Sequence, residues 1–195
     1  MLHGLTHQWS LSALGCAWAI LGMVWLAGIA FTKKTVRRQP PGTRIFYGCL
    51  AITGFTLLGS KWFATGWFAT RIIPNSPMFD LLGLALGLAG CAFAIWARIT
   101  IGGNWSGEAT VKAGHELVTA GPYALARHPI YTGLLTASVG TAILVGELRC
   151  ALGMLLIVLA LVVKMSHEEK LMMQTFPEAY PQYRRHVKAI IPGVL

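Results

Sequence analysis

The chain has 195 residues, of which 55% are hydrophobic and only 12% are charged, and its mean hydropathy is +0.60. Soluble domains carry about 25% charged residues, so the composition excludes an ordinary soluble protein and indicates an integral membrane protein. The formal net charge of +9 includes two short basic blocks, residues 33–38 and 184–188, beside apolar runs. Such blocks set topology and contact anionic headgroups, so we predict membrane lipids and no nucleic acid as partners.

Five membrane spans are predicted, over residues 9–31, 45–60, 78–99, 129–145 and 148–163. Each approaches the roughly 20 residues that a bilayer core requires, although the last two are short. Because only Gly146-Glu147 separates these last two spans, they should form a tight antiparallel hairpin. The predicted fold is therefore an all-α, multi-pass transmembrane helical bundle.

The predicted topology follows from the basic residues. With five spans, thirteen of the sixteen Lys and Arg residues fall on one side, and the other side keeps Lys61, Arg71 and Arg149. Under the positive-inside rule the N-terminus is outside and the C-terminus is in the cytoplasm. Residues 99–128 and the C-terminal segment then share the cytoplasmic face.

We predict one structural unit with two parts. Residues 1–98 would anchor the protein through three spans, and residues 99–195 would form the catalytic half, with a cytoplasmic connector, a transmembrane hairpin and a C-terminal cytoplasmic helix. In the third span, Gly83, Gly87 and Gly90 recur at close to one-turn spacing. This pattern favours close approach of a neighbouring helix in lipid.

Polar side chains converge between residues 104 and 169. The connector is Gly-rich and dense in hydrogen-bonding groups from Asn104 to Tyr123, which is typical of loops that carry functional groups, although an ordinary inter-span loop is the alternative. Arg127-His128-Pro129-Ile130-Tyr131 then opens the fourth span. Pro129 suits a first helical turn, and free N–H groups at a helix start favour an anion.

A glutamate pair, Glu168-Glu169, follows the fifth span. Adjacent helical residues point about 100° apart, so we expect at most one of the two to face the bundle. Converging ionisable groups at membrane depth indicate a functional site. The alternative is a solvated turn of a cytoplasmic helix.

A metal site is not predicted. The glutamates follow His167, but the HExxH signature needs a second His where Leu171 stands. The four cysteines include no CxxC pair and are typical of small buried hydrophobes. The sequence also contains no P-loop, no GxSxG and no GxGxxG after a strand.

Together these residues resemble the isoprenylcysteine carboxyl methyltransferase family and its relatives among phospholipid methyltransferases. The resemblance covers about the C-terminal half, residues 104–193. The motifs that carry it are His115-Glu116-Leu117-Val118, Gly121-Pro122-Tyr123, Arg127-His128-Pro129-Ile130-Tyr131, Glu168-Glu169, Phe176-Pro177-Glu178-Ala179-Tyr180, Tyr183 and Ile191-Pro192-Gly193.

The resemblance implies an integral membrane enzyme that moves a methyl group from S-adenosylmethionine to a lipophilic acceptor at the cytoplasmic membrane face, leaving S-adenosylhomocysteine. N–H groups near His128 would hold the cofactor's carboxylate, and Glu168 its ammonium or ribose hydroxyls. No catalytic acid or base is identified, because a carboxylate nucleophile needs none. By position, the implied cofactor contacts are His115, Glu116, Leu117, Val118, Tyr123, His128, Pro129, Ile130, Tyr131 and Glu168.

One position departs from the family pattern. Members that methylate a carboxyl group carry an arginine four residues before the first glutamate of the pair, where it meets the substrate, and here that residue is Lys164. Lysine keeps the positive charge but lacks the planar guanidinium with which arginine binds a carboxylate through two hydrogen bonds. The resemblance therefore implies that Lys164 is a substrate-binding residue that contacts the substrate differently from arginine. The acceptor stays open between a prenylated cysteine, a lipid amine and a small thiol.

Two interpretations belong to other classes. One is a sterol-type membrane reductase using NADPH, although the sequence shows no clear phosphate-binding cluster, and the other is a non-enzymatic membrane protein. In every case the predicted location is a membrane crossed several times. It would be the plasma membrane in a prokaryote and the endoplasmic reticulum in a eukaryote.

Overall fold

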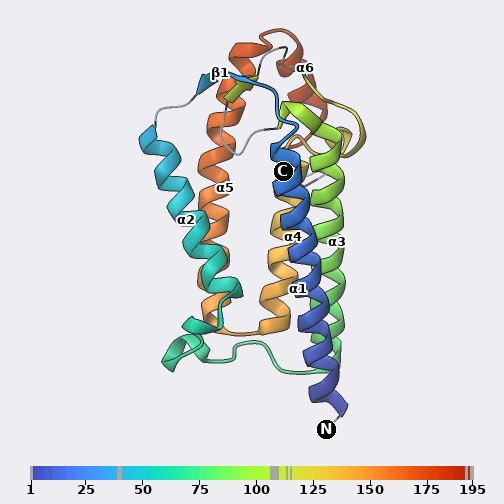
Figure 1. Ribbon diagram of the computed structural model, residues 1–195, viewed down its shortest axis with the longest axis vertical. Coiled ribbons are helices and arrows are strands. Elements are labelled where there is room, and N and C mark those ends of the chain that lie inside the picture. The colour runs from blue at the N-terminus through green and yellow to red at the C-terminus, as the bar shows by residue number, and fades with distance from the viewer. Residues whose placement is uncertain are drawn as a thin grey trace.

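The computed structural model describes residues 2–38, 41–105, 110–112, 114, 116–191 and 193. Five long helices run along one axis (Figure 1): α1 (Leu2–Ile29), α2 (Pro41–Gly59), α3 (Pro77–Ile101), α4 (Pro129–Val145) and α5 (Leu148–Thr175). The connections hold the short helix α6 (Ala179–His186), strands β1 (Thr35–Arg38) and β2 (Thr110–Lys112), and 3₁₀ turns at Lys61–Phe63, Gly66–Ala69, Gly102–Asn104 and Gly121–Ala124.

The helices confirm the predicted membrane bundle. α4 begins at Pro129 and ends at Val145, and Gly146 adopts the left-handed conformation (φ 70°) that commonly ends a helix. α5 continues beyond residue 163 to Thr175 without a break. Within the described residues, α1, α3 and α5 are long and apolar enough to cross a membrane, and α4 is a shorter apolar helix. The chain is a multi-pass membrane protein, while five spans and their orientation stay predictions.

Small residues bring α3 and α4 into close contact. A methyl group placed on Gly133 would lie 2.6 Å from the backbone nitrogen of Ala94, and one on Gly83 would lie 2.8 Å from the carbonyl oxygen of Gly140. Both distances are below van der Waals contact, so these positions admit no larger side chain without separating the helices. The predicted packing role of the α3 glycines is confirmed.

α2 packs mainly against α5, while α1, α3 and α4 form the other group of the bundle (Figure 1). The α2–α5 contact also depends on glycine, because a methyl group on Gly54 would lie 2.8 Å from the carbonyl oxygen of Gly153. α4 and α5 are joined by the predicted two-residue link. The hairpin therefore connects the two groups at one end of the bundle.

Arginine side chains close helix ends at this hairpin. Arg149 is buried and donates through Nη1 to the carbonyl oxygens of Leu57 and Ser60 at the end of α2, at 2.7 and 3.0 Å. Its Nε pairs with Glu147 at 2.5 Å. Arg71 donates to the Val145 carbonyl at the end of α4, at 3.0 Å. These contacts satisfy carbonyl groups that a helix leaves without partners at its C-terminus.

The opposite end carries α6 and a two-stranded antiparallel ribbon that the sequence did not predict (Figure 1). In the ribbon, Thr35 of β1 lies opposite Lys112 of β2, and Arg38 lies opposite Thr110. Strands of four and three residues are too short to show an alternating pattern. The ribbon ties the link after α1 to the connector after α3.

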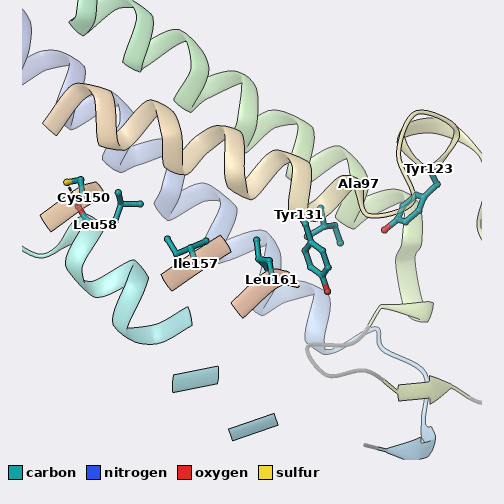
Figure 2. Packing of buried hydrophobic residues seen from close by; sticks show 8 residues of the cluster. Leu58, Ala97, Tyr123, Tyr131, Cys150, Ile157 and Leu161 are labelled. Carbon is teal, nitrogen blue, oxygen red and sulfur yellow. Dashed lines mark hydrogen bonds between the residues drawn. The ribbon is translucent and has the colours of Figure 1, made fainter. Parts of the chain in front are cut away.

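A row of buried side chains runs between the helices (Figure 2). It starts at Leu58 and Cys150, passes Ile157 and Leu161, and reaches Tyr131 near the end that carries the ribbon. The apolar row thus ends at a tyrosine whose hydroxyl lies among charged groups. That end of the bundle holds the candidate site.

Candidate functional site

A cavity of about 470 Å³ lies between the two helix groups, at the end of the bundle that carries α6. Its walls come from α1, α2, the end of α3, the connector, α4, α5 and α6. The volume falls within the range of roughly 300–1,000 Å³ that is usual for small-molecule sites. The predicted site residues that line it are Glu116, Leu117, Val118, Tyr123, His128, Pro129, Ile130, Tyr131, Lys164 and Glu168. His115 lies outside the described residues.

Of the glutamate pair, Glu168 is the member that faces the cavity. α5 continues past its apolar part, so Lys164 and Glu168, four residues apart, share one helix face. The Tyr131 hydroxyl donates to Glu168 Oε2 at 2.6 Å, and Lys164 Nζ lies 3.7 Å from Oε1. A negative charge is therefore held in place beside a cation on the cavity wall.

Glu169 points elsewhere and does not line the cavity. Arg127 donates to its Oε1 through Nε at 3.0 Å and through Nη2 at 2.5 Å, and Arg184 Nε lies 3.5 Å from its Oε2. The expected divergence of the two glutamates is confirmed. Glu168 belongs to the cavity, and Glu169 belongs to an ion cluster behind it.

His128 lies between the two carboxylates. Its ring is parallel to the Tyr131 ring, with 5.3 Å between centroids, and its nitrogens lie 3.6 Å from Glu168 and 3.3 Å from Glu169. Burial is the largest influence and favours the neutral ring, but hydrogen bonds and attraction to both carboxylates outweigh it and raise the pKa of His128. The protonated form of His128 is therefore favoured over the neutral ring.

The segment after α6 packs along the start of α4. The backbone N–H groups of Arg127 and His128 donate to the carbonyl oxygens of Lys188 and Ala189 at 2.8 and 2.9 Å. The Thr132 hydroxyl donates to the Ile190 carbonyl at 2.7 Å. The sequence interpretation had left the N–H groups near His128 available for an anion. That interpretation is wrong for Arg127 and His128, because the chain's own carbonyl groups take them.

Three tyrosines close the cavity near α6. The Tyr183 hydroxyl donates to the Tyr123 carbonyl oxygen at 2.5 Å, which joins α6 to the connector. Burial, opposed by nearby Arg127, raises the pKa of Tyr183 to about 12. Burial also raises the pKa of Tyr123 and Tyr180. These phenols stay neutral at physiological pH and can donate hydrogen bonds.

Sequence reasoning missed the contribution of the first two helices to the cavity. Trp25 of α1 and Tyr47, Ala51 and Phe55 of α2 line it, so the first 98 residues do more than anchor the protein. The sequence could not reveal this role, because an apolar residue that lines a cavity has the same identity as one that faces lipid or packs in the core. Tyr47, which is buried near the start of α2, was the one polar hint.

The connector is tied to the end of α1. Lys33 Nζ donates to Asn104 Oδ1 and to the Gly114 carbonyl oxygen, both at 2.9 Å. The Trp105 ring packs edge-on against the Trp25 ring, with 6.1 Å between the two centroids. The guanidinium carbon of Arg98 lies over the Trp105 ring, 4.4 Å from its centroid. Asn104 and Trp105, two of the connector residues singled out in the sequence, thus belong to a wall of the cavity that is tied to α1 and to the segment after it.

Comparison with known proteins shows that the segment carrying this site is similar to one family. The description of the isoprenylcysteine carboxyl methyltransferase family matches residues 82–174, which include Lys164, Glu168 and most of α3 to α5. This segment, just under half of the chain, is therefore similar to that family. The matched residues include the Arg127–Tyr131 motif and the glutamate pair, which carry part of the resemblance seen in the sequence.

Several curated proteins are similar to the chain. Protein-S-isoprenylcysteine O-methyltransferase B of Arabidopsis thaliana is 30% identical over 57% of this chain and 58% of its own length. The Xenopus laevis protein-S-isoprenylcysteine O-methyltransferase is 30% identical over 59% of this chain and 41% of its own. The cobalt-zinc-cadmium resistance protein CzcN of Cupriavidus metallidurans is 27% identical, over 65% and 53%. The chain spans about half the length of these relatives.

A solved structure shares the fold. The eukaryotic intramembrane Ras methyltransferase ICMT aligns over 76% of this chain and 52% of its own, with a TM-score of 0.55 and 24% identity. This likeness supports the isoprenylcysteine carboxyl methyltransferase type of membrane fold. Within the described residues, no group of three or more His, Cys, Asp or Glu side chains is placed to hold a metal ion.

Proposed function

We propose that this protein is an integral membrane methyltransferase that uses S-adenosylmethionine to methylate a lipophilic acceptor at the cytoplasmic face of the membrane. The observation that carries the proposal is Glu168. Its carboxylate faces a cavity of about 470 Å³ within the segment that matches the methyltransferase family. The predicted cofactor residues that the structure describes line the same cavity.

The chemistry of the cavity suits this cofactor. Glu168 supplies a negative charge that an ammonium group or ribose hydroxyls can meet. The side chains of Tyr131, Tyr123 and Trp105 are among those that line the walls, and aromatic side chains suit both an adenine ring and a cationic sulfonium centre. When bound, S-adenosylmethionine supplies a methyl group on sulfonium, which becomes a neutral thioether after transfer.

The chain's own residues would act by alignment and exclusion of water. Glu168 is fixed by Tyr131 at 2.6 Å, so the charge that orients the donor needs no rearrangement on binding. His128 faces two carboxylates through its two nitrogens, which leaves it poorly placed as a general base. A carboxylate or thiolate acceptor needs no base, whereas an amine would have to arrive deprotonated.

The acceptor would lie along α2. Ile52 and Phe55 of α2 and Leu161 of α5 give this side of the cavity an apolar lining, and the Ile52 side chain is exposed. A hydrocarbon chain would therefore meet apolar side chains on this side of the cavity. The activity named for the plant and frog relatives makes a prenylated cysteine the first acceptor to test.

Titration of the detergent-purified protein with S-adenosylhomocysteine in a calorimeter tests the donor site. We expect saturable binding, and transfer of labelled methyl groups from S-adenosylmethionine to at least one of prenylcysteine, lipid-amine and thiol acceptors. A folded protein that binds NADPH but neither adenosyl ligand would contradict the proposal and favour the reductase interpretation.

A further inference from the structure

A short sequence repeat follows α2 at the hairpin end of the bundle. The motif Trp-Phe-Ala-Thr occurs twice between residues 62 and 70. Its two copies begin in the 3₁₀ turns Lys61–Phe63 and Gly66–Ala69, which lie beyond the end of α2 (Figure 1). The side chain of Trp62 is 90% exposed and that of Trp67 is 60% exposed. Two large aromatic side chains therefore project from this end of the protein.

The repeat is fixed to the α4–α5 hairpin. The Thr70 carbonyl oxygen accepts from the N–H of Leu148 at 2.9 Å, and the N–H of Ile72 donates to the Gly146 carbonyl oxygen at 2.8 Å. Arg71, between them, donates to the last residue of α4 at 3.0 Å. The segment that presents the two tryptophans is therefore held in a defined place by backbone and side-chain hydrogen bonds.

A third tryptophan is exposed at the same end. Trp9 of α1 is 76% exposed. Two residues before it, His7 Nδ1 lies 2.7 Å from Oδ1 of Asp80, in the first turn of α3. This part of α1 therefore also lies at the hairpin end, and Figure 1 shows α1 and the two 3₁₀ turns on different sides of that end. Three of the seven tryptophans of the chain are thus exposed around one end of the bundle.

We propose that Trp9, Trp62 and Trp67 form an aromatic belt that anchors the hairpin end in a lipid headgroup layer. Tryptophan combines a large apolar ring with an N–H donor and is enriched where membrane meets water. The lipid headgroups are the partner of this surface. The belt would be present whichever reaction the cavity supports.

Backbone and side chains of the repeat together select the headgroup layer. Residues 60–76 form no α-helix, so many of their N–H and C=O groups have no partner within a helix and cannot lie exposed in hydrocarbon. The exposed indole rings are in turn unfavourable in bulk water. The headgroup layer offers hydrogen-bond partners to the backbone and apolar contact to the rings.

Charge and arrangement favour lipid over a protein partner. Residues 60–76 contain Lys61 and Arg71 but no Asp or Glu, and Lys61 is exposed, which suits lipid phosphate groups. Aromatic residues that dominate a protein interface cluster near the centre of one patch. The three tryptophans instead lie on different sides of the bundle end, as contact with a flat lipid layer requires.

The belt also determines the depth of the cavity in the membrane. α4 has 17 residues and is therefore about 25 Å long, whereas the hydrocarbon core of a bilayer is about 30 Å thick. If the end of α4 at Val145 is held beside one headgroup layer, its start at Pro129 lies near the opposite edge of the hydrocarbon. The belt thus holds the charged end of the cavity close to the other membrane surface.

Fluorescence quenching tests the inference on the full chain in phosphatidylcholine vesicles. The acyl chains carry bromine either near the headgroup or near the chain ends. Wild-type emission minus that of a Trp62→Phe, Trp67→Phe double variant gives the emission of these two rings. We expect bromine near the headgroup to quench it at least about twofold more strongly than bromine near the chain ends, and aqueous iodide to quench it little.

Two further variants complete the experiment. Trp9→Phe should give the same preference for bromine near the headgroup, and it keeps the inference testable if the double variant does not fold. Trp18→Phe is the control, because the Trp18 indole donates to the Thr141 hydroxyl inside the bundle at 3.0 Å. The emission of Trp18 should show no preference for bromine near the headgroup.

Three results would overturn the inference. Quenching of the Trp62 and Trp67 emission by iodide and by neither brominated lipid would place the repeat in water. Quenching mainly by bromine near the chain ends would place it in hydrocarbon. Protection from all three quenchers would mean that protein covers this surface, and cross-linking in the vesicles would then show whether that protein is a second copy of the chain.

Discussion

The two ends of the bundle use charged side chains differently. At the α4–α5 hairpin, Arg149 and Arg71 donate to carbonyl groups at the ends of α2 and α4. These charged side chains therefore satisfy backbone hydrogen-bond acceptors. At the other end, Glu168 and Lys164 face a cavity, so charge there is directed toward a ligand. The comparison shows that burial of a charge in a membrane protein does not by itself identify a site. A buried charged side chain indicates a ligand site when it faces a cavity, and it indicates a structural role when it is hydrogen-bonded to the end of a helix.

The largest effect should come from the hairpin end. Replacing Arg149 by Met leaves Glu147 and the α2 carbonyl groups without their partner, which should cost about 3 kcal/mol and lower the Tm in detergent by roughly 6–12 °C. S-adenosylhomocysteine affinity should stay the same. The control is Lys61→Met, because Lys61 is exposed at the same end and should change stability by less than about 0.5 kcal/mol.

The glutamate pair allows a matched test at the cavity end. Glu168→Gln should weaken S-adenosylhomocysteine roughly ten- to hundredfold, because a charged partner of the ligand is lost. Glu169→Gln should instead lower the Tm, since Arg127 loses its carboxylate, and change the affinity by less than about threefold. Calorimetry and thermal unfolding of both variants measure this, and the reverse pattern would exchange the two roles.

A smaller effect is expected where the segment after α6 meets α4. Thr132→Val removes the hydroxyl that donates to Ile190 and should cost about 1 kcal/mol, or roughly 2–4 °C in Tm. Thr136→Val is the control, because that hydroxyl donates within its own helix to the Thr132 carbonyl oxygen. Equal Tm values for the two variants would mean that the contact with Ile190 adds nothing to stability.

The smallest effect should depend on pH. Because the pKa of His128 is raised in the folded protein above its ordinary value of 6.5, the imidazolium stabilises the fold fully below about pH 6.5. That stability is lost as the pH rises through the raised pKa. The Tm difference between wild type and His128→Gln should therefore be largest at low pH and shrink at high pH. A difference that grows with pH would contradict the role of the two carboxylates.

Much of the fold could be predicted because its signals are local. Long apolar runs, Pro129 and Gly146 locate α4 and the hairpin, and the α3 glycines indicate close helix packing. The predicted site residues come from motifs, and those in the described part of the chain line one cavity. The divergence of Glu168 and Glu169 followed from helix geometry alone.

The missed features depend on contacts between distant segments. Which glutamate faces the cavity depends on Arg127 and Arg184, which hold Glu169, and no local pattern shows this. The pairing of Lys188 and Ala189 with the start of α4 consists of backbone bonds, which carry no side-chain signature. The α2 wall escaped notice because Phe55 and Ala51 look the same in sequence whether they face a ligand or a lipid.

The pairing of residues 187–190 with the start of α4 also bears on biosynthesis. These residues leave the ribosome after every long helix, and chains generally fold in order from the N-terminus. The bundle can therefore insert while the N–H groups of Arg127 and His128 still lack their final partners. The site is completed only when this late segment returns to α4, so competence to bind a ligand should follow membrane insertion as a separate, later event.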